Sequence, residues 1–478
     1  MFADWDNNQE EDETLEVVRR YRDMLDTKNH SYFDLYEFEF IIDFFIEQFN
    51  FKDAFDAVRH ALNQHPYASS VKLKYSQLLI ETGKPGKALG IIRTIRDSES
   101  ANYEFFLARG IALNLTGKYS EALIDFEQAV ALCLENREEV AYSISQSFMQ
   151  VSNPKQALKY LLLAYEHNAE NLLVLYDLAL NYEKLEDIDK AIESYNRYLE
   201  QDPFAEHVWN NLGILYTSIE KFDSALDAYD FAIAVNPHYF SAYFNKADVF
   251  IYINKLQEAI GVYTELLQKD NANTKALSDL GNCYEENGDY QEALKAYDRA
   301  IHISLDCSDA WFGKGMVYFR LKKYRLSITS FKKAVGYQPG NADYWFMLGE
   351  AFARSRKLDQ AIYAYAKASS LNPLDYEALM ACAQVLFRKK RIGEAITMLI
   401  QLYQHNHENP TINYRLAAYH AYQLDYTNAY KYFEKGLKLN YQEHHDMFRQ
   451  YPKTKTLQGF KTLLEEFFQP AITVKNIK

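Results

Sequence analysis

The sequence contains few helix-breaking residues, few cysteines and no long apolar run. Among its 478 residues are 17 glycines, 10 prolines and 4 cysteines. The cysteines lie far apart without a Cys-x-x-Cys pair, so we expect reduced thiols and neither a disulfide nor a zinc site. No run of about 18 apolar residues exists, and the acidic N-terminus lacks a basic, apolar leader. We therefore expect a cytoplasmic protein of many helices joined by short turns.

Aromatic and apolar residues are plentiful instead. The chain is 48% hydrophobic and 15% aromatic, with 39 tyrosines and 30 phenylalanines. This composition is typical of a folded protein and excludes bulk disorder. A chain of this length suits several domains or one repetitive array rather than a single core. The lean cysteine usage and the compact, Tyr-rich sequence favour a bacterial source.

The sequence repeats itself with a period of 34 residues. In the segment 206–239, one unit carries Trp, Leu, Gly and Tyr at positions 4, 7, 8 and 11, followed by Ala, Tyr, Ala and Pro at positions 20, 24, 27 and 32. Stepping by 34 in both directions, with one extra residue near Arg137, gives twelve units from Leu35 to Glu443. Position 20 is small in all twelve: Ala54, Ala88, Ala122, Ala157, Ala191, Ala225, Ala259, Ala293, Ser327, Ala361, Ala395 and Ala429.

This pattern resembles the tetratricopeptide repeat, which has a 34-residue period and the same small and aromatic positions. The resemblance implies an all-α fold in which each unit is a pair of antiparallel helices and the units stack into a right-handed superhelical solenoid. Small residues at positions 8 and 20 let the helices approach closely, aromatic residues fill the space between units, and proline at position 32 ends the second helix. No unit can bury its apolar face alone.

The repeats divide the chain into three parts. We expect an acidic N-terminal segment with a capping helix at 1–34, a twelve-repeat superhelix at 35–443, and a C-terminal capping helix and tail at 444–478. A stripe of Leu15, Val18, Tyr21 and Leu25 predicts the first cap, and Leu457, Phe460, Leu464 and Phe467 predict the second.

No catalytic motif is present. The segment 83–88, GKPGKA, lacks both the spacing of a phosphate-binding loop and the Ser or Thr that follows its lysine. Its first glycine, Gly83, falls at position 15, in a turn between helices. His405 and His407 would point to different faces of a helix. We expect no enzyme activity, no catalytic residue, no cofactor and no metal site.

Relatives of this kind line a concave groove with side chains of the first helix of each repeat. Carried over by position, the resemblance places eight aromatic residues there: Tyr142, Tyr176, Phe244, Phe312 and Phe346 at position 5, Phe319 and Phe387 at position 12, and Tyr252 at position 13. Each either packs against a neighbouring helix or contacts a bound peptide. The clamp with which some relatives grip a C-terminal carboxylate is incomplete, because Asn245 matches but the partner positions do not.

Charge is unevenly distributed. The net charge of the whole chain is −14. Residues 1–307 have a net charge of −25, whereas residues 308–443 have a net charge of +8. Repeats 9, 10 and 11 alone have a basic residue at each of positions 13, 15 and 16. We call these nine residues the basic edge: Arg320, Lys322, Lys323, Arg354, Arg356, Lys357, Arg388, Lys390 and Arg391. They either complement helix dipoles as a solvated edge or bind an acidic partner.

These features favour a non-enzymatic scaffold that binds peptide segments of partner proteins in its groove. In this hypothesis the aromatic residues supply apolar contacts, and Arg320, Arg354 and Arg388 orient an acidic stretch. An alternative is binding of nucleic acid or another acidic polymer through the basic edge, against which the acidic remainder of the chain argues. A third is self-association between the acidic part of one chain and the basic part of another. No membrane insertion is expected.

Overall fold

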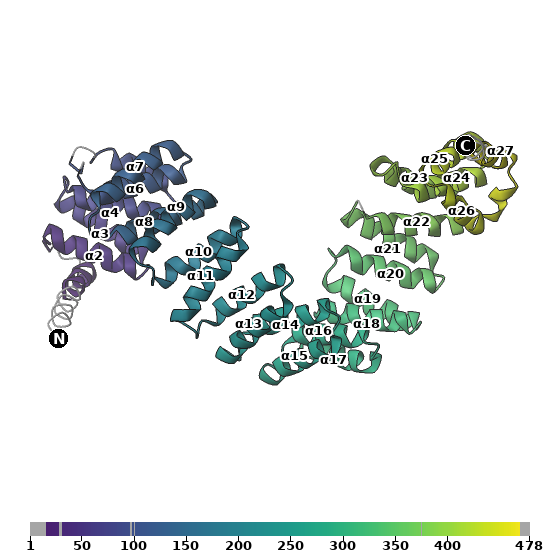
Figure 1. Ribbon diagram of the computed structural model, residues 1–478, viewed down its shortest axis with the longest axis horizontal. Helices are drawn as coiled ribbons and strands as arrows, with labels where there is room; N and C mark the ends of the chain where they lie inside the picture. The colour runs from purple at the N-terminus through teal and green to yellow at the C-terminus, as the bar shows by residue number, and fades with distance from the viewer. Residues whose placement is uncertain (1–15, 28–30, 96–97, 100, 374, 469–478) are drawn as a thin grey trace, which may run out of the picture. The chain divides into compact units, whose positions relative to one another are not determined.

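The computed structural model describes residues 16–27, 31–95, 98–99, 101–373 and 375–468, and all regular secondary structure in these ranges is helical. The chain forms two compact units, Met1–Asn236 and Pro237–Lys478, which are described separately (Figure 1). The boundary falls near the end of the sixth repeat, at its positions 31 and 32. The three-part division into 1–34, 35–443 and 444–478 stays a prediction.

Each repeat is a pair of helices. In the first unit the pairs are α2 (Leu35–Glu47) with α3 (Phe51–Gln64), α4 (Ser69–Glu81) with α5 (Pro85–Ile92), α6 (Tyr103–Leu115) with α7 (Tyr119–Leu132), α8 (Arg137–Gln150) with α9 (Pro154–His167), α10 (Leu172–Lys184) with α11 (Ile188–Gln201), and α12 (Glu206–Ser218) with α13 (Phe222–Val235).

The second unit continues the series. Its pairs are α14 (Phe240–Tyr252) with α15 (Leu256–Lys269), α16 (Thr274–Glu286) with α17 (Tyr290–Ile303), α18 (Ser308–Arg320) with α19 (Tyr324–Tyr337), α20 (Ala342–Arg354) with α21 (Leu358–Leu371), α22 (Tyr376–Arg388) with α23 (Ile392–His405), and α24 (Pro410–Tyr422) with α25 (Tyr426–Leu439). The all-α repeat fold and the twelve repeats predicted from the sequence are confirmed. Only α8 departs from the register, beginning one residue early at Arg137, where the sequence has its extra residue.

A left-handed residue joins the two helices of every repeat. Position 15 has a positive φ in all twelve, between 54° at Phe49 and 87° at Gly288. The backbone N–H groups of positions 15 and 16 donate back to the carbonyls of positions 12 and 11. In the eleventh repeat, for example, Lys390 N–H donates to Phe387 O (2.9 Å) and Arg391 N–H to Leu386 O (3.0 Å). This is the Schellman arrangement, which satisfies carbonyls that a helix end leaves open.

Tryptophan side chains tie some repeats to the preceding loop. The indole Nε1–H of Trp209 donates to the carbonyl of Pro203, and that of Trp345 donates to the carbonyl of Pro339, each at 2.9 Å. In both cases position 4 of one repeat bonds position 32 of the previous repeat. The indole N–H of each partly exposed ring thus has a hydrogen-bond acceptor, and the bond ties the first helix of one repeat to the loop before it.

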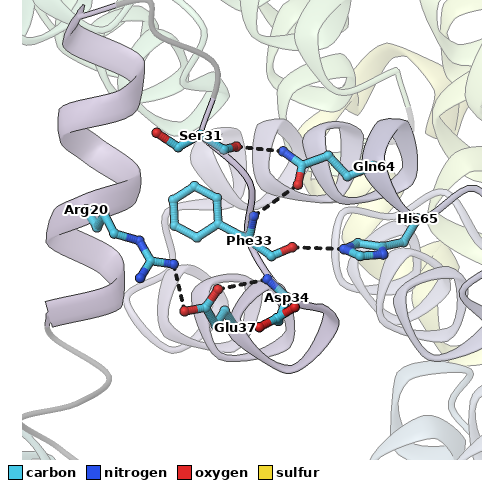
Figure 2. A network of polar contacts seen from close by, with 7 residues as sticks. All are labelled: Arg20, Ser31, Phe33, Asp34, Glu37, Gln64 and His65. Carbon is cyan, nitrogen blue, oxygen red and sulfur yellow. Dashed lines mark hydrogen bonds and ion pairs between the residues drawn. The ribbon is translucent and has the colours of Figure 1, made fainter.

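The helix at 16–27 covers the open end of the first repeat. Tyr21 is fully buried, and its hydroxyl lies 2.8 Å from Nδ1 of His60. Val18 is also buried, whereas Leu25 is partly exposed, and Leu15 lies outside the described residues. Arg20 Nη2 donates to Glu37 Oε1 at 2.6 Å, and Glu37 Oε2 accepts from the backbone N–H that starts α2 (Figure 2).

Residues 31–33, which precede α2, are held by the C-terminal end of α3. Gln64 accepts a hydrogen bond from the Phe33 N–H (3.0 Å) and donates one to the Ser31 carbonyl (2.9 Å), while Nε2 of His65 lies 2.9 Å from the Phe33 carbonyl (Figure 2). These bonds pair backbone groups that the short connection would otherwise leave open.

The C-terminal cap is an imperfect extra repeat. It consists of α26 (His444–Gln450), a 3₁₀ segment (Pro452–Thr456) and α27 (Gln458–Phe468). Phe460 is fully buried, and its ring stacks on that of Phe433 with centroids 4.2 Å apart. The predicted C-terminal helix is therefore present, and Tyr451, the residue directly after α26, belongs to the core of the second unit.

Two glycines in the second unit should respond in opposite directions to the same change. Gly288 has φ +87°, so Gly288→Ala should lower the free energy of unfolding by about 1 kcal/mol. Gly261 lies inside α15 with open space where a Cβ would be, so Gly261→Ala should raise it by about 0.5–1 kcal/mol. Urea unfolding followed by circular dichroism measures both. Shifts of the same sign would contradict this assignment of the turn.

Candidate functional site

In parts of each unit, first helices of neighbouring repeats contact one another directly. Helices α2, α4, α6 and α8 contact one another in sequence, as do α16 and α18. We call the surface made by positions 2, 5, 6, 9, 12 and 13 of these helices the inner face. Most of the aromatic residues predicted as partner-binding lie on it half-buried, with one side of the ring in the core.

Four of the position-5 rings pack against the position-24 ring of their own repeat. Ring centroids are 6.0 Å apart for Tyr176 and Tyr195. The other three pairs are Phe244 with Tyr263 (5.9 Å), Phe312 with Phe331 (5.4 Å) and Phe346 with Tyr365 (5.8 Å). Each position-5 ring is intermediate in exposure. These residues support the core and offer a ring edge to the inner face at the same time.

Tyr142 is held by hydrogen bonding between two repeats. Its hydroxyl donates to Asp177 Oδ2 at 2.8 Å, and the amide of Gln146 donates to the same oxygen. Burial raises the pKa of Asp177, while the two hydrogen bonds oppose that rise. Burial, with the neighbouring carboxylate, also raises the pKa of Tyr142. Tyr142 therefore carries a polar link across the inner face of the first unit.

The position-12 and position-13 residues differ among themselves. Phe387 stacks on Tyr419 of α24 with centroids 4.4 Å apart and meets Tyr451 at 5.2 Å, so the twelfth repeat and the C-terminal cap both cover it. Phe319 packs edge-on against Tyr324 at 5.6 Å. Tyr252, in contrast, is 71% exposed, which makes it the predicted aromatic residue most accessible to a partner.

A group of charged residues that sequence reasoning did not single out lies beside Phe244. Lys275 Nζ sits 4.2 Å from the centre of the Phe244 ring. Burial raises the pKa of Asp279 to about 6; Lys275 opposes the rise, and Asp248 and Asp309 add to it. Partial desolvation also raises the pKa of Asp248, although much of this residue's surface is exposed, and Lys275 opposes the rise. The only feature of the sequence that could have identified Lys275, Asp279 and Asp248 was their place at positions 2, 6 and 9, which face the groove in related proteins.

The three predicted arginines have different surroundings. Arg320 Nε lies 2.7 Å from Oε1 of the buried Glu285, so it is tied to the neighbouring repeat. Arg354 Nε lies 3.7 Å from Glu350 on its own helix. Arg388 is exposed, and no carboxylate of the described residues pairs with it. The structure therefore leaves Arg388, and to a lesser degree Arg354, available to a partner.

One hollow in the first unit has a volume of about 290 Å³. It lies among α5, α6 and α7, and its charged lining is dominated by the ion pair of Arg109 with the buried Asp125, whose Nε and Oδ2 atoms are 2.6 Å apart. The carboxylate hydrogen bond raises the pKa of Arg109. Both charges satisfy each other, which is the expected state of a buried pair in a structural role.

Chemistry-bearing clusters are scarce in the described part of the chain. No group of three or more His, Cys, Asp or Glu side chains there could hold a metal ion. None of the helices described above is both long and apolar enough to cross a membrane.

Five family models match the chain. Four are tetratricopeptide repeat models, over residues 142–206, 208–239, 254–314 and 308–341. The fifth, the cytochrome c-type biogenesis protein H TPR domain, matches residues 330–446. No curated protein sequence matches the chain.

Several solved structures are similar at low identity. MamA from Desulfovibrio magneticus RS-1 shares 22% identity over 34% of this chain and 92% of its own, with a TM-score of 0.31. A tetratricopeptide repeat protein from Parabacteroides merdae shares 17% over 52% and 98%, with a TM-score of 0.40. The Cut9–Hcn1 assembly of the APC/C shares 15% over 80% and 89%, with a TM-score of 0.38.

The raised pKa of Asp279 predicts a pH dependence of stability. Its folded-state pKa, about 6, exceeds the ordinary value near 4, so the stability contributed by the protonated form is complete below about pH 4 and lost as the pH rises through 6. Asp279→Asn should remove this loss and be more stable than the wild type at pH 7.

Urea unfolding at several pH values between 4 and 8 measures the difference between the two proteins. Asp343→Asn is the matched control, because Asp343 lies exposed in the first turn of α20. A constant difference between wild type and Asp279→Asn across this range would show that the carboxylate is not desolvated.

Proposed function

The chain belongs to the tetratricopeptide repeat family, and on this premise we propose that the inner face of its second unit binds an extended segment of a partner protein. The coarser function, a protein-interaction scaffold, follows from the family. The observation that carries the finer proposal is the row of half-exposed rings Phe244, Phe312 and Phe346, with the exposed Tyr252 beside them.

The rings suit apolar side chains of such a segment. They are already fixed by their partners at position 24, so binding orders few side chains and loses little conformational entropy. In the first unit, Tyr142 and Tyr176 offer a similar edge. Phe319 and Phe387 contribute mainly by keeping the first helices in place.

The arginines at position 13 supply the polar part of the recognition. Arg354 and Arg388 orient an acidic stretch of the partner, because arginine forms charge-assisted bidentate hydrogen bonds with carboxylates. Arg320 acts indirectly, through its bond to Glu285, by fixing the rim between α16 and α18.

Photo-crosslinking tests where the partner lies. A benzophenone amino acid replacing Tyr252 should crosslink to captured partner protein, whereas the same probe replacing Tyr363, which is 58% exposed on the second helix α21, should not. Mass spectrometry of the crosslinked peptides identifies the segment. Equal yields at the two sites, or crosslinks at position 363 alone, would contradict binding on the inner face.

Charge reversal tests the arginines. Arg354→Glu with Arg388→Glu should weaken binding of the crosslinked segment at least tenfold, since two attractive contacts become repulsive. Lys333→Glu with Lys367→Glu is the matched control, because both lysines are exposed on second helices of the same unit. Titration of the labelled segment against each variant gives the affinities, and equal affinities would remove the arginines from the recognition.

A further inference from the structure

The basic edge contains a second charged surface outside the inner face. Residues 321–323, 355–357 and 389–391 form the turns between α18 and α19, α20 and α21, and α22 and α23. Together they contain seven basic residues and no acidic one. Two of the seven are paired, Lys389 with Asp359 and Arg391 with Glu394. The corresponding turns of repeats 8 and 12 read NGD and QLD, so the concentration of charge begins and ends with these three repeats.

The turn geometry directs these side chains into solvent. Lys322, Arg356 and Lys390 occupy the left-handed position with φ of 59°, 60° and 61°, and all three are exposed. They have no ion pair with any described residue. Three neighbouring repeats thus present unneutralised cations at equivalent places, which repel one another at the roughly 10 Å spacing of packed helices.

Helix stability does not explain this pattern. Position 16, held by Lys323, Lys357 and Arg391, is the N-cap of the second helix, where the dipole disfavours a positive charge. Five of the other nine repeats place Asn or Asp there, for example Asn153 and Asp187, whose side chains accept a backbone N–H, and the remaining four place Lys. The cations at positions 15 and 16 are therefore tolerated by the fold rather than required by it.

The sequence contains a segment of opposite charge. Residues 1–16 include seven acidic residues, and the first basic residue after them is Arg19. Fully extended, such a segment reaches about 50 Å. The edge spans two repeat-to-repeat steps of roughly 10 Å each, so one segment is long enough to contact all three turns.

We propose that the position-15 cations of repeats 9–11, Lys322, Arg356 and Lys390, bind the acidic N-terminal segment of a second copy of this chain. The docking surface lies on the turns, away from the inner face, so a partner segment on the inner face and an N-terminal segment on the turns can be bound together. Neutralisation of the mutually repelling cations drives the pairing, and salt weakens it.

A labelled peptide of residues 1–16 is the direct probe. It should bind saturably to a variant of the full chain that lacks residues 2–14. Lys322→Glu with Arg356→Glu and Lys390→Glu should weaken it at least tenfold. Glutamate is compatible with this turn position, because Glu186 and Glu220 occupy it in repeats 5 and 6. Fluorescence anisotropy gives the affinities.

The matched control reverses three lysines of equivalent turns elsewhere. Lys118→Glu with Lys221→Glu and Lys255→Glu changes the net charge equally at exposed position-16 residues of repeats 3, 6 and 7, and should leave peptide affinity unchanged. Equal loss in both triple variants, or no loss in either, would overturn the proposal. So would a single-stranded oligonucleotide of equal charge that binds ten times more tightly than the peptide.

Self-association of the full chain tests whether the pairing joins two copies. Sedimentation equilibrium of the wild type in low salt should show association that disappears at 0.5 M NaCl. The association should also be absent in the variant that lacks residues 2–14 and in the edge variant, which carries Lys322→Glu, Arg356→Glu and Lys390→Glu. A monomer under all these conditions would overturn the pairing. Because the edge variant leaves the inner-face rings intact, crosslinking at position 252 reports on the proposed function independently.

Discussion

The close contact between an aromatic ring and a small residue is the constraint on which the fold depends. In five repeats, position 8 is a glycine facing the ring at position 24. A Cβ at Gly213 would lie 2.5 Å from Cε1 of Tyr229, and one at Gly281 would lie 2.5 Å from Cε1 of Tyr297. Distances this short require the ring to move, so helix spacing, ring position and side-chain size are set together.

This constraint extends to the inner face. The ring at position 24 also supports the ring at position 5, as Tyr365 supports Phe346, so the buried core and the candidate binding surface share side chains. A surface of this kind is preorganised, because its rings cannot rotate away without disturbing the helix pair. It also means that replacing a position-5 ring changes stability and binding together, which is why the exposed Tyr252 reports on binding more cleanly.

The register of the repeats could be predicted from the sequence because the same local residue preferences recur in all twelve repeats. The small residue at position 20 and the turn at position 15 fix where each helix begins and ends. The surroundings of particular side chains were not readable. The bond of Arg320 to Glu285, the covering of Phe387 by Tyr451 and the charged group around Asp279 all join residues of different repeats. A periodic pattern averages over such contacts and does not contain them.

The turn between the two helices of a repeat requires a left-handed conformation at position 15, but the residue type at this position varies. Nine of the twelve position-15 residues are not glycine, although a left-handed conformation costs an ordinary residue roughly 1–2 kcal/mol. The stacked repeats can bear that cost because the neighbouring helices hold each turn. The side chain at position 15 points away from the helix pair and contributes little to its packing. The residue type there is free to follow other demands, and in repeats 9–11 it is always basic.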